Sequence, residues 1–264
     1  MTTPVAVVTG ASSGIGRALA KQLDSEGYTL VLCDVNEPGL RETQAMLQRG
    51  SQRVTLDVSR RPAVEAMAAD VIARHGRIDL LINNAGVTVD ASIAEVSIED
   101  FEWLFGINFW GVVYGTKAFL PKMLEQREGT IVNISSVFGI IGFPRHGTYS
   151  ASKFAVRGFT EALWCELEGT GVTAVSVHPG GIKTNIARDA RSNGTAAAKE
   201  KRAADFSRVA RTTPEQAAAV ILRGVYDKKR RVMIGADAQI IQLMQRLLPE
   251  SYPAIVTALE KRSR

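Results

Sequence analysis

Short apolar runs recur along the chain, and most are followed by a longer segment with the apolar spacing of an amphipathic helix. The runs are rich in Val, Ile and Leu and have few polar positions, which is typical of strands that are buried on both faces of a parallel sheet. The predicted strands are residues 5–8, 29–32, 53–56, 80–82, 130–134, 173–177 and 232–234. The predicted helices are residues 15–25, 63–73, 103–124, 149–168 and 214–226. This alternation predicts an α/β fold, a doubly wound parallel sheet of about seven strands with helices on both faces.

The chain has a length that one α/β domain can have. At 264 residues it can bury a sizeable core, and it shows no internal repeat or interdomain linker. We therefore expect a single domain over residues 1–264. The one break in composition is a polar, alanine-rich and charged stretch at residues 187–211, which suggests an inserted excursion.

Few residues of the types that build metal sites or disulfide frameworks are present. Cys33 and Cys165 are far apart, and His75, His146 and His178 are equally scattered. This spacing implies no metal site and no disulfide framework. The N-terminus lacks the positive region of a signal peptide, and the first apolar run is too short to span a membrane. We therefore expect a soluble, cytoplasmic protein with no membrane span.

Positive charge gathers towards the end of the chain. The net charge is +5, and residues 183–264 hold 17 basic and 8 acidic residues. A basic region can bind nucleic acid, an anionic lipid surface or an anionic ligand. The densest run, KKRR at residues 228–231, has no interleaved aromatic residues and precedes a predicted strand. A solvated surface turn is the better interpretation, and no nucleic-acid partner is expected.

A glycine-rich turn joins the first predicted strand to the first predicted helix. In TGASSGIGRA, residues 9–18, Gly10, Gly14 and Gly16 stand where backbone N–H groups can approach a pyrophosphate at a helix N-terminus. The spacing differs from the G-x-G-x-x-G of the general dinucleotide fingerprint, and a tight strand-to-helix connection is an alternative. The turn therefore predicts a dinucleotide site only in combination with other residues.

An acidic residue follows the second predicted strand. Asp34 comes about 20 residues after the turn, where a carboxylate can accept hydrogen bonds from both hydroxyls of an adenosine ribose. An ionised Asp also repels a 2′-phosphate, and the next residue, Val35, is not basic. Asp34 could instead begin the loop DVNEPG, because Asp is common in turns. The ribose interpretation favours NAD over NADP as the cofactor.

Several motifs follow one another in an order and spacing that together are highly specific. They are TGxxxGxG at residues 9–16, NNAG at 83–86, YSASK at 149–153 and HPGGIKT at 178–184. With these motifs the chain resembles the short-chain dehydrogenase/reductase (SDR) family, over all but roughly the last 25 residues. The resemblance implies a Rossmann fold, a nicotinamide cofactor and a catalytic tetrad. The tetrad residues would be Asn108, Ser136, Tyr149 and Lys153.

The chemistry of the tetrad can also be argued from residue types. Tyr149 and Lys153 are four residues apart at the start of a predicted helix, so their side chains project from one face. A nearby ammonium lowers the pKa of a tyrosine, which makes Tyr149 a candidate general acid/base. Ser136 can polarise the substrate oxygen, and the family spacing of 13 residues before the tyrosine selects it over Ser135. The role of Asn108, whose backbone would hold a water beside the lysine, rests on the resemblance, because spacing alone also fits a packing or capping residue.

The resemblance also implies which residues contact the cofactor. The glycine-rich turn with Ile15 would contact the pyrophosphate, Asp57 the adenine, Lys153 the nicotinamide ribose, and the loop HPGGIKT the carboxamide. Asn83 and Ala85 would flank the adenine ribose, whereas Asp57 could instead cap the next helix. The full set of implied cofactor-binding residues is Gly10, Ser12, Ser13, Gly14, Ile15, Gly16, Asp34, Asp57, Val58, Asn83, Ala85, Gly86, Tyr149, Lys153, Pro179, Gly180, Ile182 and Thr184.

The substrate pocket is the part that the sequence specifies least. The segment after the catalytic serine, VFGIIGFP at residues 137–144, is apolar, and Phe138 and Phe143 join Ser136 and Tyr149 as candidate substrate-binding residues. A hydroxysteroid-like or other hydrophobic secondary alcohol, interconverted with its ketone, is favoured over a sugar. The same side chains could equally pack against the sheet.

A lid over the pocket is expected at residues 185–213, where basic residues outnumber acidic ones. Those charges leave open an NADPH-dependent reduction of a 3-oxoacyl thioester, although Asp34 argues against NADPH. A dinucleotide-binding regulator without turnover is a further alternative, and the complete tetrad argues against it.

The C-terminal extension, residues 237–264, carries apolar residues at helical spacing. Residues 240, 241, 244, 247 and 248 fall on one predicted stripe of a short helix that ends at Pro249. Basic residues nearby would allow peripheral membrane association, but packing over the pocket or against another subunit is the commoner use of such a stripe. The resemblance implies a homodimer or homotetramer, with the predicted helices at 103–124 and 149–168 as candidate interfaces.

Overall fold

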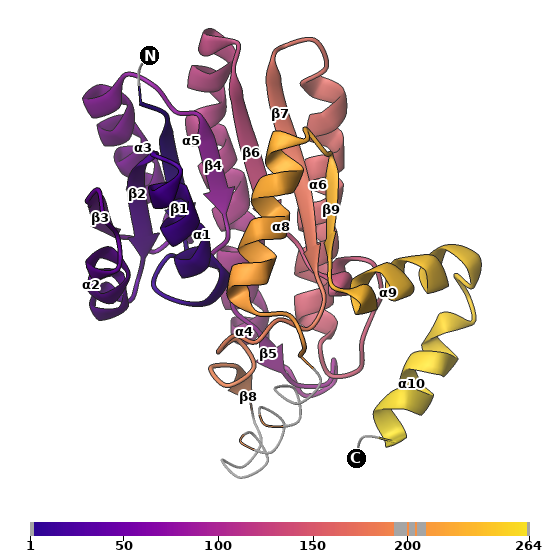
Figure 1. Ribbon diagram of the computed structural model, residues 1–264. Helices are drawn as coiled ribbons and strands as arrows, with labels where there is room; N and C mark the ends of the chain where they lie inside the picture. Colours follow the sequence, from indigo (N-terminus) through magenta and orange to yellow (C-terminus); the bar gives the residue numbers. More distant parts are fainter. Residues whose placement is uncertain (1–2, 193–199, 201–203, 205–209, 263–264) are drawn as a thin grey trace.

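The fold is built on one seven-stranded parallel sheet (Figure 1). The structure, a computed structural model, describes residues 3–192, 200, 204 and 210–262. All neighbouring strands of the sheet run parallel, and the predicted doubly wound α/β fold is confirmed. In sheet order the strands are β3 (Ser51–Thr55), β2 (Thr29–Asp34), β1 (Val5–Thr9), β4 (Leu80–Asn83), β6 (Gly129–Ile134), β7 (Val172–Pro179) and β9 (Arg231–Ile234).

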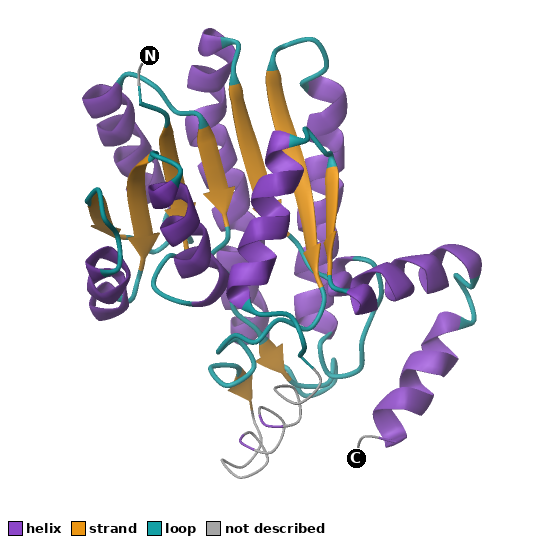
Figure 2. Ribbon diagram, in the orientation of Figure 1, coloured by secondary structure: helices purple, strands orange, loops and turns teal. Residues whose placement is uncertain are grey.

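Apolar side chains of each central strand alternate between two cores, one on each face of the sheet. Ala6 and Val8 of β1 pack in the first core, and Val5 and Val7 pack in the second. Because both faces are buried, these strands read as uninterrupted apolar runs in the sequence. Figure 2 shows the sheet as the middle layer between helices. The first core is covered by α1 (Gly14–Ser25), α2 (Glu37–Ala45) and α8 (Pro214–Tyr226), and the second by α3 (Arg61–His75), α5 (Gly111–Gln126) and α6 (Gly147–Glu166).

The single helix predicted at residues 103–124 is a succession of three helical segments. They are α4 (Ile98–Phe105), a π-helical turn η1 (Gly106–Trp110) and α5. The Ser97 side chain caps α4, so this helix begins before the predicted start. A π turn inserts an extra residue into a helix and is frequent at functional sites. Here the turn contains Asn108, which is fully buried.

Two short strands pair beyond the carboxyl ends of the main sheet. β5 (Val89–Asp90) runs parallel to β8 (Arg191–Ser192). Arg145 ties this pair to the segment before α6, because its Nε donates to Asp90 Oδ1 at 2.8 Å. Most of the predicted lid falls on residues 193–199, 201–203 and 205–209, which lie outside the described residues. The lid therefore stays a prediction.

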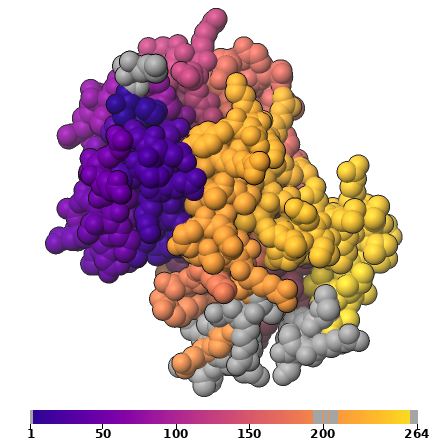
Figure 3. Space-filling view, viewed as in Figure 1, coloured from indigo at the N-terminus to yellow at the C-terminus, as the bar shows by residue number. Residues whose placement is uncertain are grey.

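The C-terminal extension forms two helices at the side of the molecule, drawn in yellow in Figure 3. They are α9 (Ala236–Leu247) and α10 (Tyr252–Arg262). Ile241 and Met244 pack inwards, whereas Ile240 is 65% exposed and Leu247 is 67% exposed. The prediction of one continuous apolar stripe is wrong in part, because the apolar residues of α9 are divided between an inner and an outer face.

None of the helices in the described ranges combines the length and apolarity needed to cross a membrane. The same ranges contain no group of His, Cys, Asp and Glu side chains that could hold a metal ion. Cys33 is buried and Cys165 is exposed, and both are free thiols.

Candidate active site

The glycine-rich turn and the NNAG segment meet where the strand order reverses. β1 and β4 are neighbours, with β2 on the outer side of β1 and β6 on the outer side of β4. Ligands of open α/β sheets bind beyond the carboxyl ends of the strands at such a point. The two segments are joined there, because Thr9 Oγ1 accepts hydrogen bonds from the N–H groups of Asn84 and Ala85, both at 3.0 Å. The sheet therefore places two predicted nucleotide-binding segments side by side.

The glycines of the turn are required for different reasons. Gly10 has φ +66°, and a Cβ there would lie 2.7 Å from Asn84 Nδ2. A Cβ at Gly16 would overlap the carbonyl oxygen of Gly10. Packing of the chain on itself thus requires these two glycines. A Cβ at Gly14 would lie 3.2 Å from Thr184 Cγ2, which shows that the turn approaches the HPGGIKT loop.

The N-terminus of α1 is suited to bind a phosphate. Its N-cap residue, Ser13, makes no capping hydrogen bond through its side chain. The first backbone N–H groups of a helix have no partners within the helix, and they attract anions. Ile15 packs its side chain against the first core, so its predicted pyrophosphate contact could come only from its backbone. This arrangement fits the pyrophosphate of a dinucleotide.

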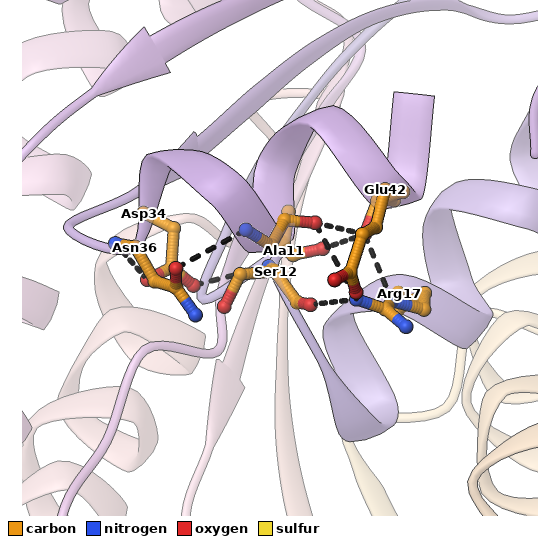
Figure 4. A network of polar contacts seen from close by, with 8 residues as sticks. Ala11, Ser12, Arg17, Asp34, Asn36 and Glu42 are labelled. Carbon is orange, nitrogen blue, oxygen red and sulfur yellow. Dashed lines mark hydrogen bonds and ion pairs between the residues drawn. The ribbon is translucent and has the colours of Figure 1, made fainter. Parts of the chain in front are cut away.

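The carboxylate of Asp34 lies beside the turn in a fixed orientation (Figure 4). Its Oδ2 accepts a hydrogen bond from the N–H of Ser12 at 3.1 Å, and its Oδ1 accepts one from the N–H of Asn36 at 3.0 Å. Arg17 lies on the other side of Ser12 and pairs with Glu42 at 2.8 Å. The backbone thus orients Asp34 as a ribose-binding carboxylate requires.

Three predicted catalytic side chains gather around the start of α6. Lys153 Nζ lies 5.6 Å from the centre of the Tyr149 ring, one helical turn away. Ser136 precedes the short helix η2 (Val137–Gly139), and its Oγ accepts a hydrogen bond from the N–H of Phe138 at 3.1 Å. The Ser136 side chain is also near enough to Tyr149 to lower the pKa of the phenol. Ser135 Oγ instead donates to the carbonyl oxygen of Lys153 at 2.8 Å. The geometry therefore separates the two serines and places Ser136 beside the tyrosine.

Burial controls the protonation of Tyr149 and Lys153. Loss of solvent raises the pKa of Tyr149 to about 12, and the proximity of the Ser136 hydroxyl lowers that pKa by less. Loss of solvent also lowers the pKa of Lys153 to about 8. The expectation of a lowered tyrosine pKa is therefore wrong for this structure, in which burial raises the pKa of Tyr149. The neighbouring ammonium of Lys153 donates to the carbonyl of Ile134 at 2.8 Å. At neutral pH Tyr149 is protonated and can donate a proton.

Asn108 is connected to the site through the segment that follows β4. Its Oδ1 accepts from the N–H of Val87 at 2.8 Å, and its Nδ2 donates to the carbonyl of Val87 at 2.9 Å. A Cβ at Gly86 would lie 3.3 Å from Asn108 Oδ1 and 3.5 Å from Lys153 Nζ. Asn108 and Lys153 thus approach the same glycine of the NNAG motif.

The HPGGIKT loop continues from β7 towards the glycine-rich turn. Pro179 is the last residue of β7, and the N–H of Gly180 donates to the carbonyl of Ile234 at 2.9 Å. Ile182 is buried in the first core, so its side chain serves packing. Thr184 is the residue of this loop that lies against the turn, at Gly14.

The side chains of two predicted cofactor-binding residues make hydrogen bonds within the protein. The Asn83 side chain is buried and donates to Asn133 Oδ1 at 2.9 Å, so a contact with the ribose could come only from its backbone. That contact stays a prediction. Asp57 Oδ1 accepts from the N–H and the hydroxyl of Ser59 at 2.9 and 2.7 Å, which stabilises the turn before α3. The neighbouring Val58 is buried.

Aromatic side chains of the 137–144 segment surround one side of Tyr149. The rings of Phe138 and Phe143 stack with centroids 4.8 Å apart, and Phe138 meets Tyr149 edge-on at 6.2 Å. Ile140 and Ile141 of the same segment are buried with the C-terminal helices. The aliphatic residues therefore pack inwards, and Phe138 and Phe143 pack against them beside Tyr149. The role of the two aromatic residues in binding substrate stays a prediction.

Sequence reasoning missed a buried histidine behind Ser136. His178 Nδ1 lies 3.0 Å from the carbonyl oxygen of Ser136, and Nε2 lies 2.9 Å from Ser176 Oγ. A carbonyl can only accept, so Nδ1 carries the proton and the serine hydroxyl donates to Nε2. Burial lowers the pKa of His178 to about 4. The HPGGIKT motif contains His178, but no sequence signal reveals that its ring meets the carbonyl of Ser136, which follows β6.

Comparison with known proteins agrees with this geometry. The sequence model of the family described as "short chain dehydrogenase" matches residues 4–195. The putative oxidoreductase SadH of Mycobacterium tuberculosis is 43% identical over 263 residues, which covers 96% of this chain and 94% of that protein.

Solved structures of the same kind are similar over nearly the whole chain. A short-chain dehydrogenase/reductase from Burkholderia phymatum in complex with NAD has a TM-score of 0.86 and 32% identity, covering 93% of both chains. A serine dehydrogenase complexed with NADP+ has a TM-score of 0.80 and 27% identity, covering 87% of this chain and 94% of that one. The family match, the parallel sheet and the placement of the motifs agree, and the chain belongs to the short-chain dehydrogenase family of oxidoreductases.

Proposed function

We propose that this oxidoreductase interconverts a secondary alcohol and its ketone with NAD(H), with Tyr149 as the general acid/base. The observation that carries the proposal is the grouping of Tyr149, Lys153 and Ser136: the Lys153 Nζ lies 5.6 Å from the centre of the Tyr149 ring, and Ser136 is near enough to act on the pKa of the phenol. This group lies at the carboxyl ends of the strands, as do the glycine-rich turn and the acidic residue Asp34, which suit a dinucleotide. The complete tetrad supports turnover rather than a purely regulatory role.

Tyr149 transfers the proton at the substrate oxygen. In reduction the phenol donates its proton to the ketone oxygen, while the Ser136 hydroxyl donates a hydrogen bond to the same oxygen. In oxidation the phenolate takes the proton from the alcohol, and the ammonium of Lys153 favours that phenolate against the effect of burial. A bound nicotinamide supplies the hydride acceptor or donor.

The charges around Asp34 support NAD rather than NADP. Arg17 forms an ion pair with Glu42 of α2. Arg41 and Arg53 both pair with the carboxylate of Glu37, at 2.5 and 3.5 Å. A 2′-phosphate would face the Asp34 carboxylate while these three guanidinium groups stay paired with acids. Since solved relatives hold either NAD or NADP, the preference rests on these local charges.

An apolar substrate fits the surroundings of Tyr149. The stacked pair of Phe138 and Phe143 offers aromatic surface next to the phenol, and this segment contributes few polar groups that could bind the hydroxyls of a sugar. A hydroxysteroid or another hydrophobic secondary alcohol is therefore the proposed substrate class.

A homodimer or homotetramer in the cytoplasm is the proposed working form. Trp110 is 46% exposed and Phe154 is 40% exposed, and both belong to the helical segments named as candidate interfaces. Such large apolar side chains are the kind that subunit interfaces bury.

The proposal is tested by following absorbance at 340 nm with NAD and NADP in parallel. The panel contains hydroxysteroids, hydrophobic secondary alcohols, sugar alcohols and a 3-oxoacyl thioester, together with the matching ketones. We expect turnover of apolar alcohols with NAD. Preference for NADP would overturn the argument from Asp34, and activity confined to polyols would overturn the argument from Phe138. NADH binding without turnover of any substrate would instead indicate a regulator.

A further inference from the structure

The C-terminal extension is attached directly to the HPGGIKT loop. Asp237, in the first turn of α9, accepts a hydrogen bond through Oδ2 from the backbone N–H of Gly181 at 2.7 Å. Main-chain partners also hold the loop, because the N–H of Gly180 donates to the carbonyl of Ile234 and the N–H of Lys183 donates to the carbonyl of Thr212, both at 2.9 Å. Among the described residues that these bonds connect, Asp237 provides the side-chain link between the extension and the loop.

The chain around Asp237 is shaped to admit its carboxylate. A Cβ at Gly180 would overlap Asp237 Oδ2, and a Cβ at Gly235 would overlap Asp237 Oδ1. Gly235 also has φ +95°, a conformation that side chains disfavour. A carboxylate in the first turn of a helix is further stabilised by the helix dipole. The local backbone thus fixes the carboxylate against the loop from two sides.

The far end of the same loop lies against the glycine-rich turn. Thr184, three residues beyond Gly181, is the residue that approaches Gly14 at the start of α1. Between Gly181 and Thr184 the chain is short, and Ile182 is anchored in the core. Gly181 is itself part of the loop that is proposed to bind the nicotinamide end of the cofactor, so a displacement of its backbone would change that part of the loop directly.

We propose that Asp237 is a positioning residue, which holds residues 179–184 in the conformation that binds the nicotinamide end of NAD(H). The inference rests on the proposed function, since it requires that this loop binds the cofactor. Asp237 acts through the loop backbone and does not itself touch substrate or cofactor. The C-terminal extension thereby becomes part of the construction of the cofactor site.

A second contact of the extension supplies an internal contrast. The hydroxyl of Tyr252, at the start of α10, accepts a hydrogen bond from the N–H of Gly142 at 3.2 Å. Gly142 belongs to the 137–144 segment beside Tyr149, on the substrate side. Loss of this contact should weaken the binding of the substrate and leave the binding of the cofactor unchanged.

The test compares Asp237→Ala, Asp237→Asn, Tyr252→Phe and a control, Asp227→Ala, whose carboxylate pairs with Lys229 on the surface. NADH affinity is measured by fluorescence titration, thermal stability by melting, and exchange of the Gly181 amide by hydrogen–deuterium exchange. One lost hydrogen bond to a charged acceptor predicts about tenfold weaker NADH binding for Asp237→Ala. Faster exchange at Gly181 should accompany it. Asp237→Asn keeps an acceptor oxygen and should recover most of the affinity.

Steady-state kinetics separate positioning from a merely structural role. At saturating NAD, kcat of Asp237→Ala should stay within about threefold of the unaltered enzyme while KM for NAD rises about tenfold. Tyr252→Phe should raise KM for the alcohol and leave NADH affinity unchanged, and Asp227→Ala should match the unaltered protein.

An equal loss of NADH affinity in Asp237→Asn and Asp237→Ala, with a large fall in melting temperature, would mean a structural role and overturn the inference. Unchanged NADH affinity in Asp237→Ala would overturn it alone, whereas absence of NADH binding by the unaltered protein would overturn the proposed function as well.

Discussion

Burial, more than charge pairing, determines the protonation of individual residues in the candidate site. Lys153 is 3% exposed and His178 is 0% exposed, and burial lowers the pKa of each. Burial likewise raises the pKa of Tyr149. Burial thus shifts each of the three groups towards its neutral form, but with a pKa of about 8 Lys153 is still mostly an ammonium at pH 7. That ammonium and a bound, positively charged nicotinamide would both shift Tyr149 towards the phenolate.

The stability of the protein should fall with acidification because of His178. Its pKa is about 4 in the folded protein and about 6.5 in an unfolded chain, so the unfolded state binds the proton more readily between these values. Stability is fully present above pH 6.5 and is lost as the pH falls towards 4, by roughly 3 kcal/mol for this one group. Chemical denaturation at a series of pH values measures the slope.

The matched variant for this prediction is His178→Asn, which keeps a donor near the carbonyl of Ser136 but does not titrate. The free energy of unfolding of this variant should change less between pH 6.5 and 4 than that of the unaltered protein. Parallel curves for the two proteins would show that His178 does not contribute to the acid sensitivity.

At the residue scale, the sequence was sufficient to predict which side chains lie together in the candidate site where they share a short spacing or a family motif. Tyr149 and Lys153 are on one helix turn, so helical geometry alone brings them together. Ser136 required the family spacing, because nothing local separates it from Ser135. Asn83 could not be assigned from its motif, since its partner Asn133 lies on a neighbouring strand that only the fold places beside it.

Element packing explains why two helical glycines should behave in opposite ways. Gly115 lies on α5, where a Cβ would overlap the Oδ1 of Asn83. Gly158 lies on α6, where a Cβ would meet nothing within 4 Å. Gly115 thus allows α5 to pack closely against the buried side chain of Asn83. Gly158 makes no such contact and only lowers the helix propensity of α6.

Replacement of these glycines by alanine tests the packing. Gly115→Ala should destabilise the protein by about 2 kcal/mol, because a close-packed interior must shift to admit the methyl group. Gly158→Ala should stabilise it by up to about 1 kcal/mol through helix propensity. Urea denaturation of both variants measures the two signs. A stabilised Gly115→Ala variant would contradict the described contact between α5 and β4.

At the element scale, periodicity predicted that helices exist but not how they are divided. The π turn η1 keeps the apolar spacing of its neighbours, so the 103–124 segment reads as one helix. On α9 the apolar residues are adjacent pairs, and only tertiary packing decides that Met244 faces inwards and Leu247 outwards. Strands of two residues, such as β5, carry no periodic signal at all.

The whole molecule has a surface suited to self-association, on the side of η1 and α6. The ring of Trp110 stacks on Tyr114 with centroids 5.7 Å apart, and Phe154 is 40% exposed. A pair of variants, Trp110→Glu and Phe154→Glu, should shift the protein towards monomers, because a buried unpaired charge opposes association. Light scattering after size exclusion measures the mass. A monomeric unaltered protein would contradict the proposed oligomer.

At the scale of the molecule, the alternation of apolar runs and helices was sufficient to predict the parallel sheet, because chirality and buried strands leave few topologies. The single domain and the lid remain predictions. The order of the strands places the motifs together at the carboxyl ends of the strands. The contacts of the C-terminal extension with those motifs depend on the tertiary fold, which no local sequence pattern predicts.

The most direct test of the central claim is the comparison of Tyr149→Phe with the unaltered enzyme, in turnover at 340 nm and in NADH binding. Phenylalanine keeps the ring that packs against Phe138 but removes the proton donor. We predict that kcat for alcohol oxidation falls by at least a hundredfold, in keeping with the loss of a general acid/base, while the NADH dissociation constant stays within about threefold. Substantial turnover by Tyr149→Phe, with NADH still bound, would contradict the assignment of Tyr149 and the mechanism built on it.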